Sequence, residues 1–321
     1  MTTRLLRSFS QKSGCRGHVL LGGGTGFIGS AFSYLLKSKG YEVTIISRMP
    51  GPQRMTWFDI DENGIPDNVT AVVNLAGQNI LDAMQRWTPG FKQNVINSRV
   101  NTTLTLAAAI NKAQHKPSAF VTISGVGIYK PSSTAEYDEN SDLGKPFDFL
   151  SKLAHDWESA STLPSGNDVR NVVIRSGVVL GRGGGMIKQM FPAFFFGVGG
   201  PIASGKQYLP WIHVKDMCRL LLFSIENKNA TGILNGVAPQ VVTNEEFTAA
   251  FASAMMRPAF FRLPEFVLNT MFGSERAKIM TEGQKVIPKR VLELGFKYEY
   301  PDIKSACQEC SRLFYSADKP L

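Results

Sequence analysis

One stretch near the N-terminus constrains the fold of this chain more than any other. The apolar run at 18–21 breaks into glycines at 22–24, and an apolar helical pattern follows from Phe27 to Lys39. This order predicts a strand, a tight turn and a helix, and an apolar run over 42–47 predicts the second strand of a βαβ unit. A glycine turn before a helix N-terminus is suited to a dinucleotide pyrophosphate, because free N–H groups point at the turn and no Cβ intervenes. The alternative is a turn with no ligand. The residues expected at the cofactor are Gly23, Gly26, Phe27, Ile28 and Gly29.

Strands and helices alternate from residue 18 to about 180. This alternation predicts the α/β class, with a Rossmann-like doubly wound parallel sheet and a smaller, mainly helical C-terminal substrate region. We expect an NADP-binding Rossmann domain over 18–181, with 207–237 returning to the sheet. The substrate region is expected over 182–206 and 238–315.

Local patterns add three expectations about individual elements. Trp57–Ile60 is predicted as a short strand. Thr88 and Pro89 have the residue types of a helix cap and first turn, so one helix is expected to continue to about Ala113. A helix over 215–227 is expected to be capped near Asp216.

The end of the second strand indicates which dinucleotide fits. An acidic residue there would bind the ribose 2′-hydroxyl of NAD, whereas this chain has Ser47 and Arg48. A hydroxyl and a positive charge favour a 2′-phosphate, so the predicted cofactor is NADP(H). Arg48 as a solvated surface residue is the alternative. After the strand at 69–74 come Leu75, Ala76 and Gly77, and the small residues in this segment would let the backbone approach the cofactor.

The first seventeen residues differ from the rest of the chain. They carry four basic residues and no acidic one, and Leu5, Leu6 and Phe9 can share one helix face, which is typical of a mitochondrial transit peptide. The predicted location is therefore the mitochondrial matrix, and the alternative is a disordered basic tail on a cytoplasmic protein. Removing 1–17 leaves 31 of the 35 basic residues against 26 acidic ones, which lowers the net charge from +9 to +5. With no RNA-binding signature present, nucleic-acid binding is not expected.

Neither a membrane span nor a metal site is expected. No apolar run approaches the roughly 20 residues of a transmembrane helix. The four cysteines do not form a disulfide framework. Cys307 and Cys310 lack a second pair at zinc spacing, and we interpret them as side chains of a helix.

Several motifs together resemble one family. They are the glycine motif, Ser47-Arg48, Asn74–Gly77, Ser98-Arg99, Arg175–Gly181, Trp211–Asp216 and Glu282–Pro288. From residue 18 to about 313 the chain resembles the epimerase-family branch of the atypical, extended short-chain dehydrogenases/reductases, in particular family 39U. The resemblance implies an NADP-binding Rossmann domain and a small module of unknown function near the C-terminus. It also implies cofactor contacts at Ser47, Arg48, Leu75, Ala76, Asn94, Arg99 and Val179.

The catalytic dyad of that superfamily is missing. Its tyrosine acts as acid and base, and a lysine four residues later lowers the tyrosine pKa. In the expected helix, Asp148 stands four residues before Lys152. Ser124, at a strand end, and Tyr129 remain as candidates for catalysis. Tyr137, in a loop, and His213, at a strand end, are alternatives that could equally be structural.

Two functions remain open from the sequence. The first is an NADP(H)-dependent oxidoreductase, with epimerase-like chemistry as a variant, that acts on an unknown small substrate. The alternative is a catalytically degenerate NADP(H)-binding protein that serves as a mitochondrial assembly or redox-sensing factor. The missing dyad favours the second function, and the intact cofactor turn favours the first. The substrate and the oligomeric state stay open.

Overall fold

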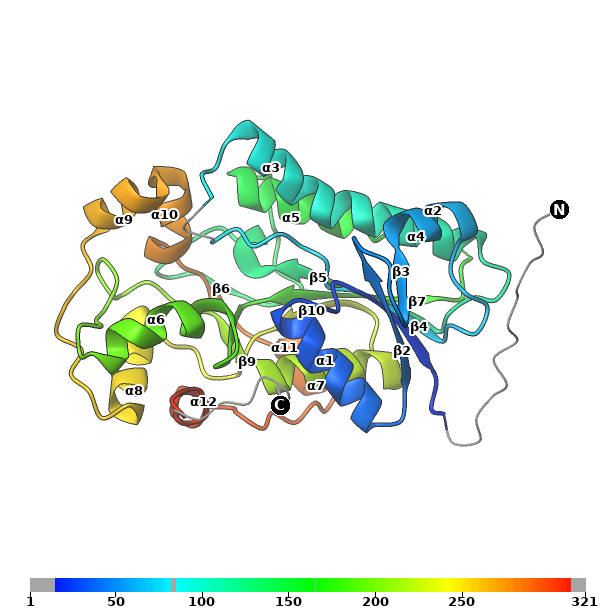
Figure 1. Cartoon of the computed structure of the whole chain (residues 1–321). Coiled ribbons are helices and arrows are strands. Elements are labelled where there is room, and N and C mark those ends of the chain that lie inside the picture. Colours follow the sequence, from blue (N-terminus) through cyan, green and yellow to red (C-terminus); the bar gives the residue numbers. More distant parts are fainter. Residues whose placement is uncertain (1–14, 82–84, 165, 313–321) are drawn as a thin grey trace.

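A seven-stranded parallel sheet forms the centre of the molecule (Figure 1). The computed structural model describes residues 15–81, 85–164 and 166–312, so most of the predicted transit peptide, residues 1–14, lies outside it. The strand order is β3-β2-β1-β4-β5-β7-β10. The α/β, Rossmann-like prediction is confirmed. The strands are β1 (His18–Gly22), β2 (Glu42–Ser47), β3 (Arg54–Thr56), β4 (Ala71–Asn74), β5 (Ala119–Gly125), β7 (Arg170–Ser176) and β10 (Gly232–Gly236).

Both faces of the sheet are covered by helices (Figure 1). Side chains alternate along β1: Val19 and Leu21 pack into the core with α1 (Phe27–Ser38) and α7 (Val214–Glu226). Leu20 points the other way, into the core with α2 (Trp57–Asn63) and α4 (Thr102–Lys112). This two-sided burial explains why β1 is a continuous apolar run. α3 (Pro89–Ile96) and α5 (Phe149–Ala160) lie on the α4 side.

A second group of helices gathers at one end of the sheet (Figure 1). It has its own apolar core, in which phenylalanines of α6 and α8 pack with Trp211. Two short parallel pairs connect this group to the rest: β8 with β9, and β6 with β11. Of the remaining elements, α11 (Lys289–Glu293) packs in the sheet core through Val291. The others are α6 (Gly185–Phe195), α8 (Asn244–Ala254), α9 (Glu265–Phe272), α10 (Ser274–Thr281), α12 (Ile303–Cys310), β6 (Glu136–Tyr137), β8 (Val178–Leu180), β9 (Trp211–His213) and β11 (Lys285–Val286).

The predicted strand at 57–60 is wrong, because these residues begin α2. Thr56 Oγ1 accepts a hydrogen bond from the Asp59 N–H at 3.1 Å, and Asp59 Oδ2 accepts one from the Thr56 N–H at 2.7 Å. This reciprocal pair is a capping box, which starts a helix. The strand lies just before it, as β3.

The long helix predicted from 88 to 113 is interrupted. It begins as predicted, with the Thr88 hydroxyl accepting from the Phe91 N–H, but 97–101 forms a π-helical turn between α3 and α4. Such turns widen a helix locally and often lie at functional sites. Arg99 is in this turn.

Two buried carboxylates attach the C-terminal segments to the sheet region. Glu139 accepts hydrogen bonds from the main-chain N–H groups of Asn235 and Arg290 at 3.0 and 3.1 Å. Asp216 accepts from those of Glu299 and Tyr300, both at 2.8 Å. Asp216 was predicted to lie near the α7 cap, but that cap is formed by His213, whose Nδ1 accepts from the Lys215 N–H.

Within the described ranges, no helix is long and apolar enough to cross a membrane. In the same ranges, no three histidine, cysteine or acidic side chains group closely enough to hold a metal ion. All four cysteines are free thiols; Cys307 and Cys310 are buried on α12.

Candidate functional site

The glycine turn lies at the carboxyl end of β1, between the ends of β2 and β4. Gly23 has φ +74°, and a Cβ there would lie 2.6 Å from the carbonyl carbon of Leu75. A Cβ at Gly29 would clash with the carbonyl oxygen of Gly23. Both glycines are therefore required by packing. Gly26 is different, since it is exposed and a Cβ there meets the protein only at 3.4 Å.

The N-terminus of α1 is open. Its N-cap, Gly26, offers no side-chain hydrogen bond, and its first turn, which includes Phe27 and Ile28, contains no acidic residue. By contrast, α2, α5 and α8 all begin with capping boxes. The first N–H groups of a helix need a partner, and an anion beside the glycine turn would supply one.

The end of β2 offers a positive charge next to this turn. Arg48 is exposed, and among the described residues no carboxylate pairs with it. Ser47 precedes it; its hydroxyl donates to the Met49 carbonyl and accepts from the Met49 N–H at 3.2 Å. The tight turn made by Ser47 fixes where the chain leaves the strand and leaves the Arg48 side chain in solvent.

Arg99 supplies a second cation at the same edge. Its guanidinium donates to the Gln78 carbonyl at 2.9 Å and lies 5.3 Å from the ring centre of Trp157. A Cβ on Gly77 would lie 3.0 Å from the central guanidinium carbon of Arg99. Burial lowers the pKa of Arg99 to about 10, and no described carboxylate pairs with it. A desolvated cation without a counterion favours an anion nearby.

The other predicted cofactor residues are distributed around these groups. Leu75, Ala76 and Gly77 follow β4 at the edge of the glycine turn. Val179 is in β8, and its carbonyl oxygen would lie 3.2 Å from a Cβ on Gly185, at the start of α6. The loop before α6 packs against Phe27, because Cβ atoms at Gly181 and Gly184 would touch that ring. Asn94 lies on the exposed face of α3, apart from this group. The contacts that these residues make with a cofactor stay a prediction.

Ser124 belongs to a buried ion-pair network. Its hydroxyl donates to Glu158 Oε1 at 2.7 Å. The guanidinium of Arg175 donates to both carboxylate oxygens of Glu158, each at 2.8 Å. Burial lowers the pKa of Arg175, but the hydrogen bonds and charge of Glu158 outweigh it, so that the pKa is raised overall. The only proton of Ser124 is committed to Glu158, so in this arrangement Ser124 does not polarise a carbonyl group as a donor.

Tyr129 continues the same network. Its hydroxyl accepts from Arg175 Nη1 at 2.9 Å and lies 2.9 Å from Oδ1 of Asn235. The side chain is 1% exposed. Burial raises the pKa of Tyr129, partly offset by the charge of Arg175. A catalytic acid and base of the dyad type needs an accessible hydroxyl with a lowered pKa, and Tyr129 has neither property here.

The dyad positions have other roles. Asp148 is the N-cap of α5, with Oδ1 accepting from the Ser151 N–H at 2.7 Å. Lys152 pairs with Asp156 at 2.9 Å on the surface. The absence of the dyad, read from the sequence, is thus matched by structural roles for both residues.

Sequence reasoning missed Glu158. A signal was present, because Glu158 is one and two turns from Ala154 and Ser151 on the buried stripe of α5. An acidic residue on such a stripe requires a buried partner. Arg175, which directly follows the apolar run 172–174 of β7, is the matching signal.

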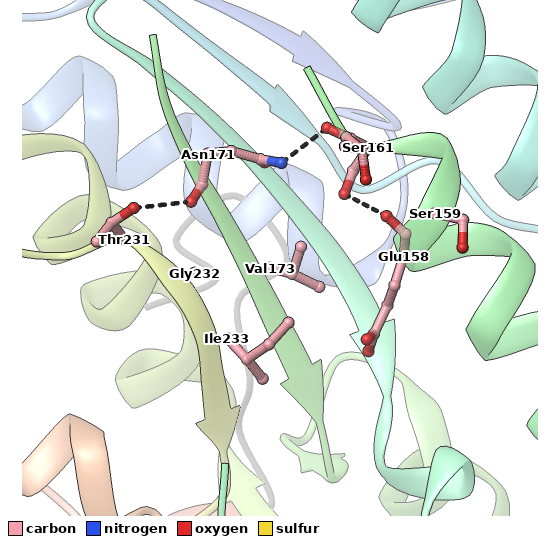
Figure 2. A pocket seen from close by; sticks show the side chains of 9 residues that line it. Glu158, Ser159, Ser161, Asn171, Val173, Thr231, Gly232 and Ile233 are labelled. Atoms are coloured by element: carbon pink, nitrogen blue, oxygen red, sulfur yellow. Dashed lines mark hydrogen bonds between the residues drawn. The ribbon is translucent and has the colours of Figure 1, made fainter. Parts of the chain in front are cut away.

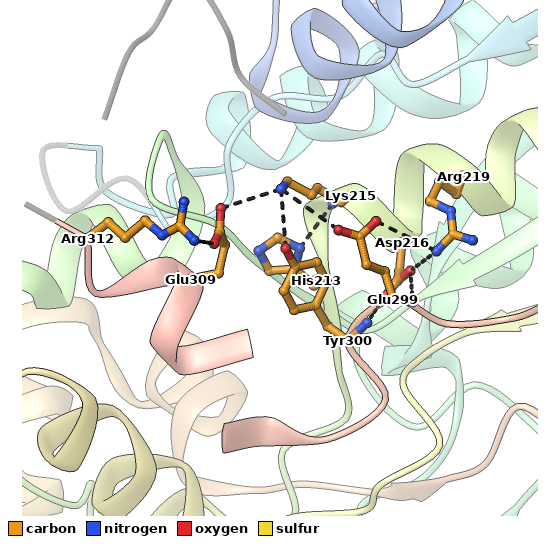
Figure 3. A network of polar contacts seen from close by, with 8 residues as sticks. All are labelled: His213, Lys215, Asp216, Arg219, Glu299, Tyr300, Glu309 and Arg312. Atoms are coloured by element: carbon orange, nitrogen blue, oxygen red, sulfur yellow. Dashed lines mark hydrogen bonds and ion pairs between the residues drawn. The ribbon is translucent and has the colours of Figure 1, made fainter. Parts of the chain in front are cut away.

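A second polar cluster joins α7 to the C-terminal segment (Figure 3). Lys215 Nζ donates to the Tyr300 hydroxyl at 3.2 Å and pairs with Glu309 at 3.4 Å. The His213 ring lies 4.0 Å from that of Tyr300. Burial and the charge of Lys215 lower the pKa of His213 to about 3, so it is neutral at physiological pH. Its Nδ1 serves as the helix cap, and the lowered pKa makes the ring a poor general acid at neutral pH.

A cavity of about 460 Å³ lies away from the glycine turn (Figure 2). Asn171 and Gly232, near the amino ends of β7 and β10, form part of its wall, whereas the glycine turn is at the carboxyl ends. Some of its lining groups bond to one another, as Asn171 Nδ2 does to the Ser161 carbonyl at 2.8 Å. This cavity is separate from the candidate cofactor site.

Comparisons with known proteins agree with this geometry. The model of the NAD dependent epimerase/dehydratase family matches residues 19–235, and that of a domain of unknown function, DUF1731, matches 263–310. The epimerase family protein SDR39U1 of Bos taurus is 52% identical over 292 residues, which cover 91% of this chain and 98% of the relative. The epimerase family protein YfhF of Bacillus subtilis is 32% identical over 300 residues, with 91% and 97% coverage. A crystal structure of human SDR39U1 (isoform 2) with NADPH has 49% identity and a TM-score of 0.90, and covers 92% of this chain and 100% of that one.

Proposed function

This chain belongs to the NAD dependent epimerase/dehydratase family, and we propose that it is an NADP(H)-dependent oxidoreductase acting on a small substrate. When bound, NADPH supplies a hydride from its nicotinamide. The observation that supports NADP(H) is a pair of cations, Arg48 and Arg99, beside an open helix N-terminus. Neither cation has a carboxylate partner among the described residues. The human relative crystallised with NADPH supports the same cofactor.

The residues of this chain have separate tasks in that proposal. The N-terminus of α1 and the Gly26 backbone receive the pyrophosphate. Arg48 binds the 2′-phosphate, and Arg99 provides a positive charge on the opposite side of the turn. Glu158 fixes the Ser124 hydroxyl through a hydrogen bond, and Arg175 in turn holds the Glu158 carboxylate. The proton for the substrate comes from a group other than Asp148 or Lys152.

Turnover is the test of the oxidoreductase proposal. Full-length protein is incubated with NADPH without oxygen, and loss of nicotinamide fluorescence is followed with a panel of small aldehydes, ketones and nucleotide sugars. Substrate-dependent loss of NADPH with matching product supports the proposal. NADPH binding without loss of fluorescence for any member of the panel contradicts it.

Arg48→Asp is expected to weaken NADPH binding by about 1–3 kcal/mol, the range for a hydrogen bond to a charged group. It is also expected to reverse the preference for NADPH over NADH, because a carboxylate repels the 2′-phosphate and accepts from a 2′-hydroxyl. Fluorescence titration with both cofactors measures this. Lys228→Asp makes the same charge change on an exposed residue just before β10, at the opposite edge of the sheet, and should leave both affinities unchanged. Equal affinity of the unaltered protein for NADPH and NADH would refute the assignment of Arg48.

Gly26→Ala is expected to lower NADPH affinity by about tenfold, or about 1.4 kcal/mol. The new methyl group has room within the protein and the φ of −77° suits alanine, so stability should hold while the methyl faces the anion. Gly90→Ala adds the same group on α3, where nothing lies within 4 Å, and is the matched control. Calorimetric titration and thermal unfolding of both variants separate binding from folding. Unchanged affinity in Gly26→Ala would place the pyrophosphate elsewhere.

A second function is favoured by the buried network. Ser124 has its proton directed to Glu158, and Tyr129 is buried with a raised pKa. These observations support catalytic degeneracy. The alternative function is then that of an NADP(H)-binding assembly or redox-sensing factor, which the basic, acid-free N-terminal segment would direct to mitochondria. Tight NADPH binding without turnover, together with a partner whose binding changes between NADPH and NADP⁺, would favour this alternative.

A further inference from the structure

The Ser124 hydroxyl can meet a ligand only through its oxygen lone pairs. Its proton points to Oε1 of Glu158, with 2.7 Å between the two oxygens. A hydroxyl group has one proton to donate and two lone pairs that accept. Among the described residues, none donates a hydrogen bond to the Ser124 oxygen. The side chain is therefore available to a ligand as an acceptor and not as a donor.

Arg175 fixes the direction of this hydrogen bond. A guanidinium group carries only donors, and here it donates to both carboxylate oxygens of Glu158, each at 2.8 Å. A carboxylate paired in this way accepts hydrogen bonds and has no proton to return to Ser124. The same guanidinium donates from Nη1 to the Tyr129 hydroxyl at 2.9 Å. No exchange of donors and acceptors within this network frees the Ser124 proton for a ligand.

Ser124 lies at the same edge of the sheet as the glycine turn. It is the last residue but one of β5, and Asn74, the last residue of the neighbouring β4, is level with Thr122. The next residue of that chain segment, Leu75, donates its N–H to the Gly22 carbonyl at 2.9 Å, where β1 enters the turn. Ligands of open α/β sheets bind outside this carboxyl edge. A ligand beside a cofactor at the turn is therefore within reach of the end of β5.

The chain just after Ser124 leaves room for such a ligand. Within the described ranges, a Cβ added to Gly125 would meet only the Gly127 nitrogen, and one added to Gly127 only the Leu150 Cβ, both at 3.9 Å. Ser124 itself is 4% exposed, so bulk water is largely kept away from it. Where water cannot substitute, a bound group that does not match the hydroxyl leaves a buried polar atom unpaired, which weakens binding.

We infer that Ser124 selects a ligand with a hydroxyl group over one with a carbonyl group in the same place. A ligand hydroxyl donates its proton to the lone pairs of Ser124. A carbonyl oxygen would face those lone pairs with no proton between the two oxygens. This inference rests on the proposed function and narrows its small substrate to an alcohol. Ser124 is then the residue that determines this specificity.

Binding without reaction tests the inference. The full chain is saturated with NADPH and titrated with alcohols by calorimetry, or saturated with NADP⁺ and titrated with ketones, so that no hydride can be transferred. The probes are pairs with one carbon skeleton: lactate and pyruvate, glycerol 3-phosphate and dihydroxyacetone phosphate, cyclohexanol and cyclohexanone. We expect at least one alcohol to bind, and its ketone to bind about tenfold more weakly, because one buried hydrogen bond is missing.

Two variants of Ser124 and one control identify the residue responsible. Ser124→Ala removes the acceptor, and Ser124→Cys keeps a donor to Glu158 but offers only a weak acceptor. Both are expected to weaken alcohol binding by about tenfold and to leave ketone binding unchanged. Ser118→Ala removes an exposed hydroxyl just before β5, at its opposite end, and should change neither. NADPH titration and thermal unfolding check that each variant is folded.

A purely structural role of Ser124 would change alcohol and ketone binding alike, and that result overturns the inference. Failure of every alcohol to bind, or a ketone that binds more tightly than its alcohol, also overturns it. Turnover decides the proposed function separately. Alcohol selectivity that is lost in Ser124→Ala, without turnover in either direction, would retain a hydroxyl-selective binding site and remove the oxidoreductase function.

Discussion

Arg175→Met is expected to lower the free energy of unfolding by about 3–5 kcal/mol, the range for removing one member of a buried ion pair. Glu158 would remain 13% exposed with no cation, and Tyr129 would lose its hydrogen-bond donor. Methionine fills similar space, so the loss of stability would come from the unpaired Glu158 charge more than from a cavity. Equilibrium unfolding in urea measures it.

The double variant Arg175→Met/Glu158→Met is the matched control. Replacing both members of a buried pair by apolar residues is often close to neutral, so much of the lost stability should return. Equal stability of the single and double variants would mean that the pair is not desolvated as described. A loss below about 1 kcal/mol, typical of surface pairs, would have the same meaning.

Acid is expected to destabilise the protein through His213. The pKa of His213 is about 3 in the folded state and 6.5 for an unperturbed histidine, so below pH 6.5 the unfolded chain binds a proton that the folded protein does not. The stabilisation is fully present above pH 6.5 and is lost as the pH falls towards 3. The loss is about 1.4 kcal/mol for each pH unit in that window. Unfolding free energies measured between pH 7 and pH 4 give the slope.

His213→Asn isolates this contribution, because asparagine can still cap α7 but does not titrate. Its stability should fall less steeply below pH 6.5 than that of the unaltered protein. His115→Asn, which removes an exposed histidine, should keep the original slope. If unfolding free energy fell with pH at the same slope in all three proteins, His213 would take up its proton in the folded state as readily as in the unfolded chain, and the prediction would be wrong.

Much of the sheet could be predicted because its strands are encoded by local patterns. β1, β4, β5 and β7 each contain an apolar run, and such runs follow from burial on both faces. The two misread segments depend on finer features. Residues 57–60 look apolar enough for a strand, but the Thr56–Asp59 capping box starts a helix. The π-helical turn at Asn97–Asn101 leaves no mark in the apolar spacing of α3 and α4.

The candidate site was predictable where spacing fixes backbone geometry. Gly23 and Gly29 could be singled out because a turn followed by a helix leaves no room for a Cβ there, and the structure has those close approaches. Side-chain pairing across distant segments was not predictable in the same way. Glu158 and Arg175 lie on different elements, so the partner that takes the Ser124 proton could be found only from the fold.

The attachment of residues 299 and 300 to Asp216 uses main-chain donors. Every amino acid except proline presents that N–H group, so substitutions at Glu299 and Tyr300 can accumulate without breaking the attachment. For these two main-chain contacts, the chemical requirement falls on one carboxylate in α7. The junction between the sheet and the C-terminal module can thus stay intact while the module's surface diverges to suit new ligands.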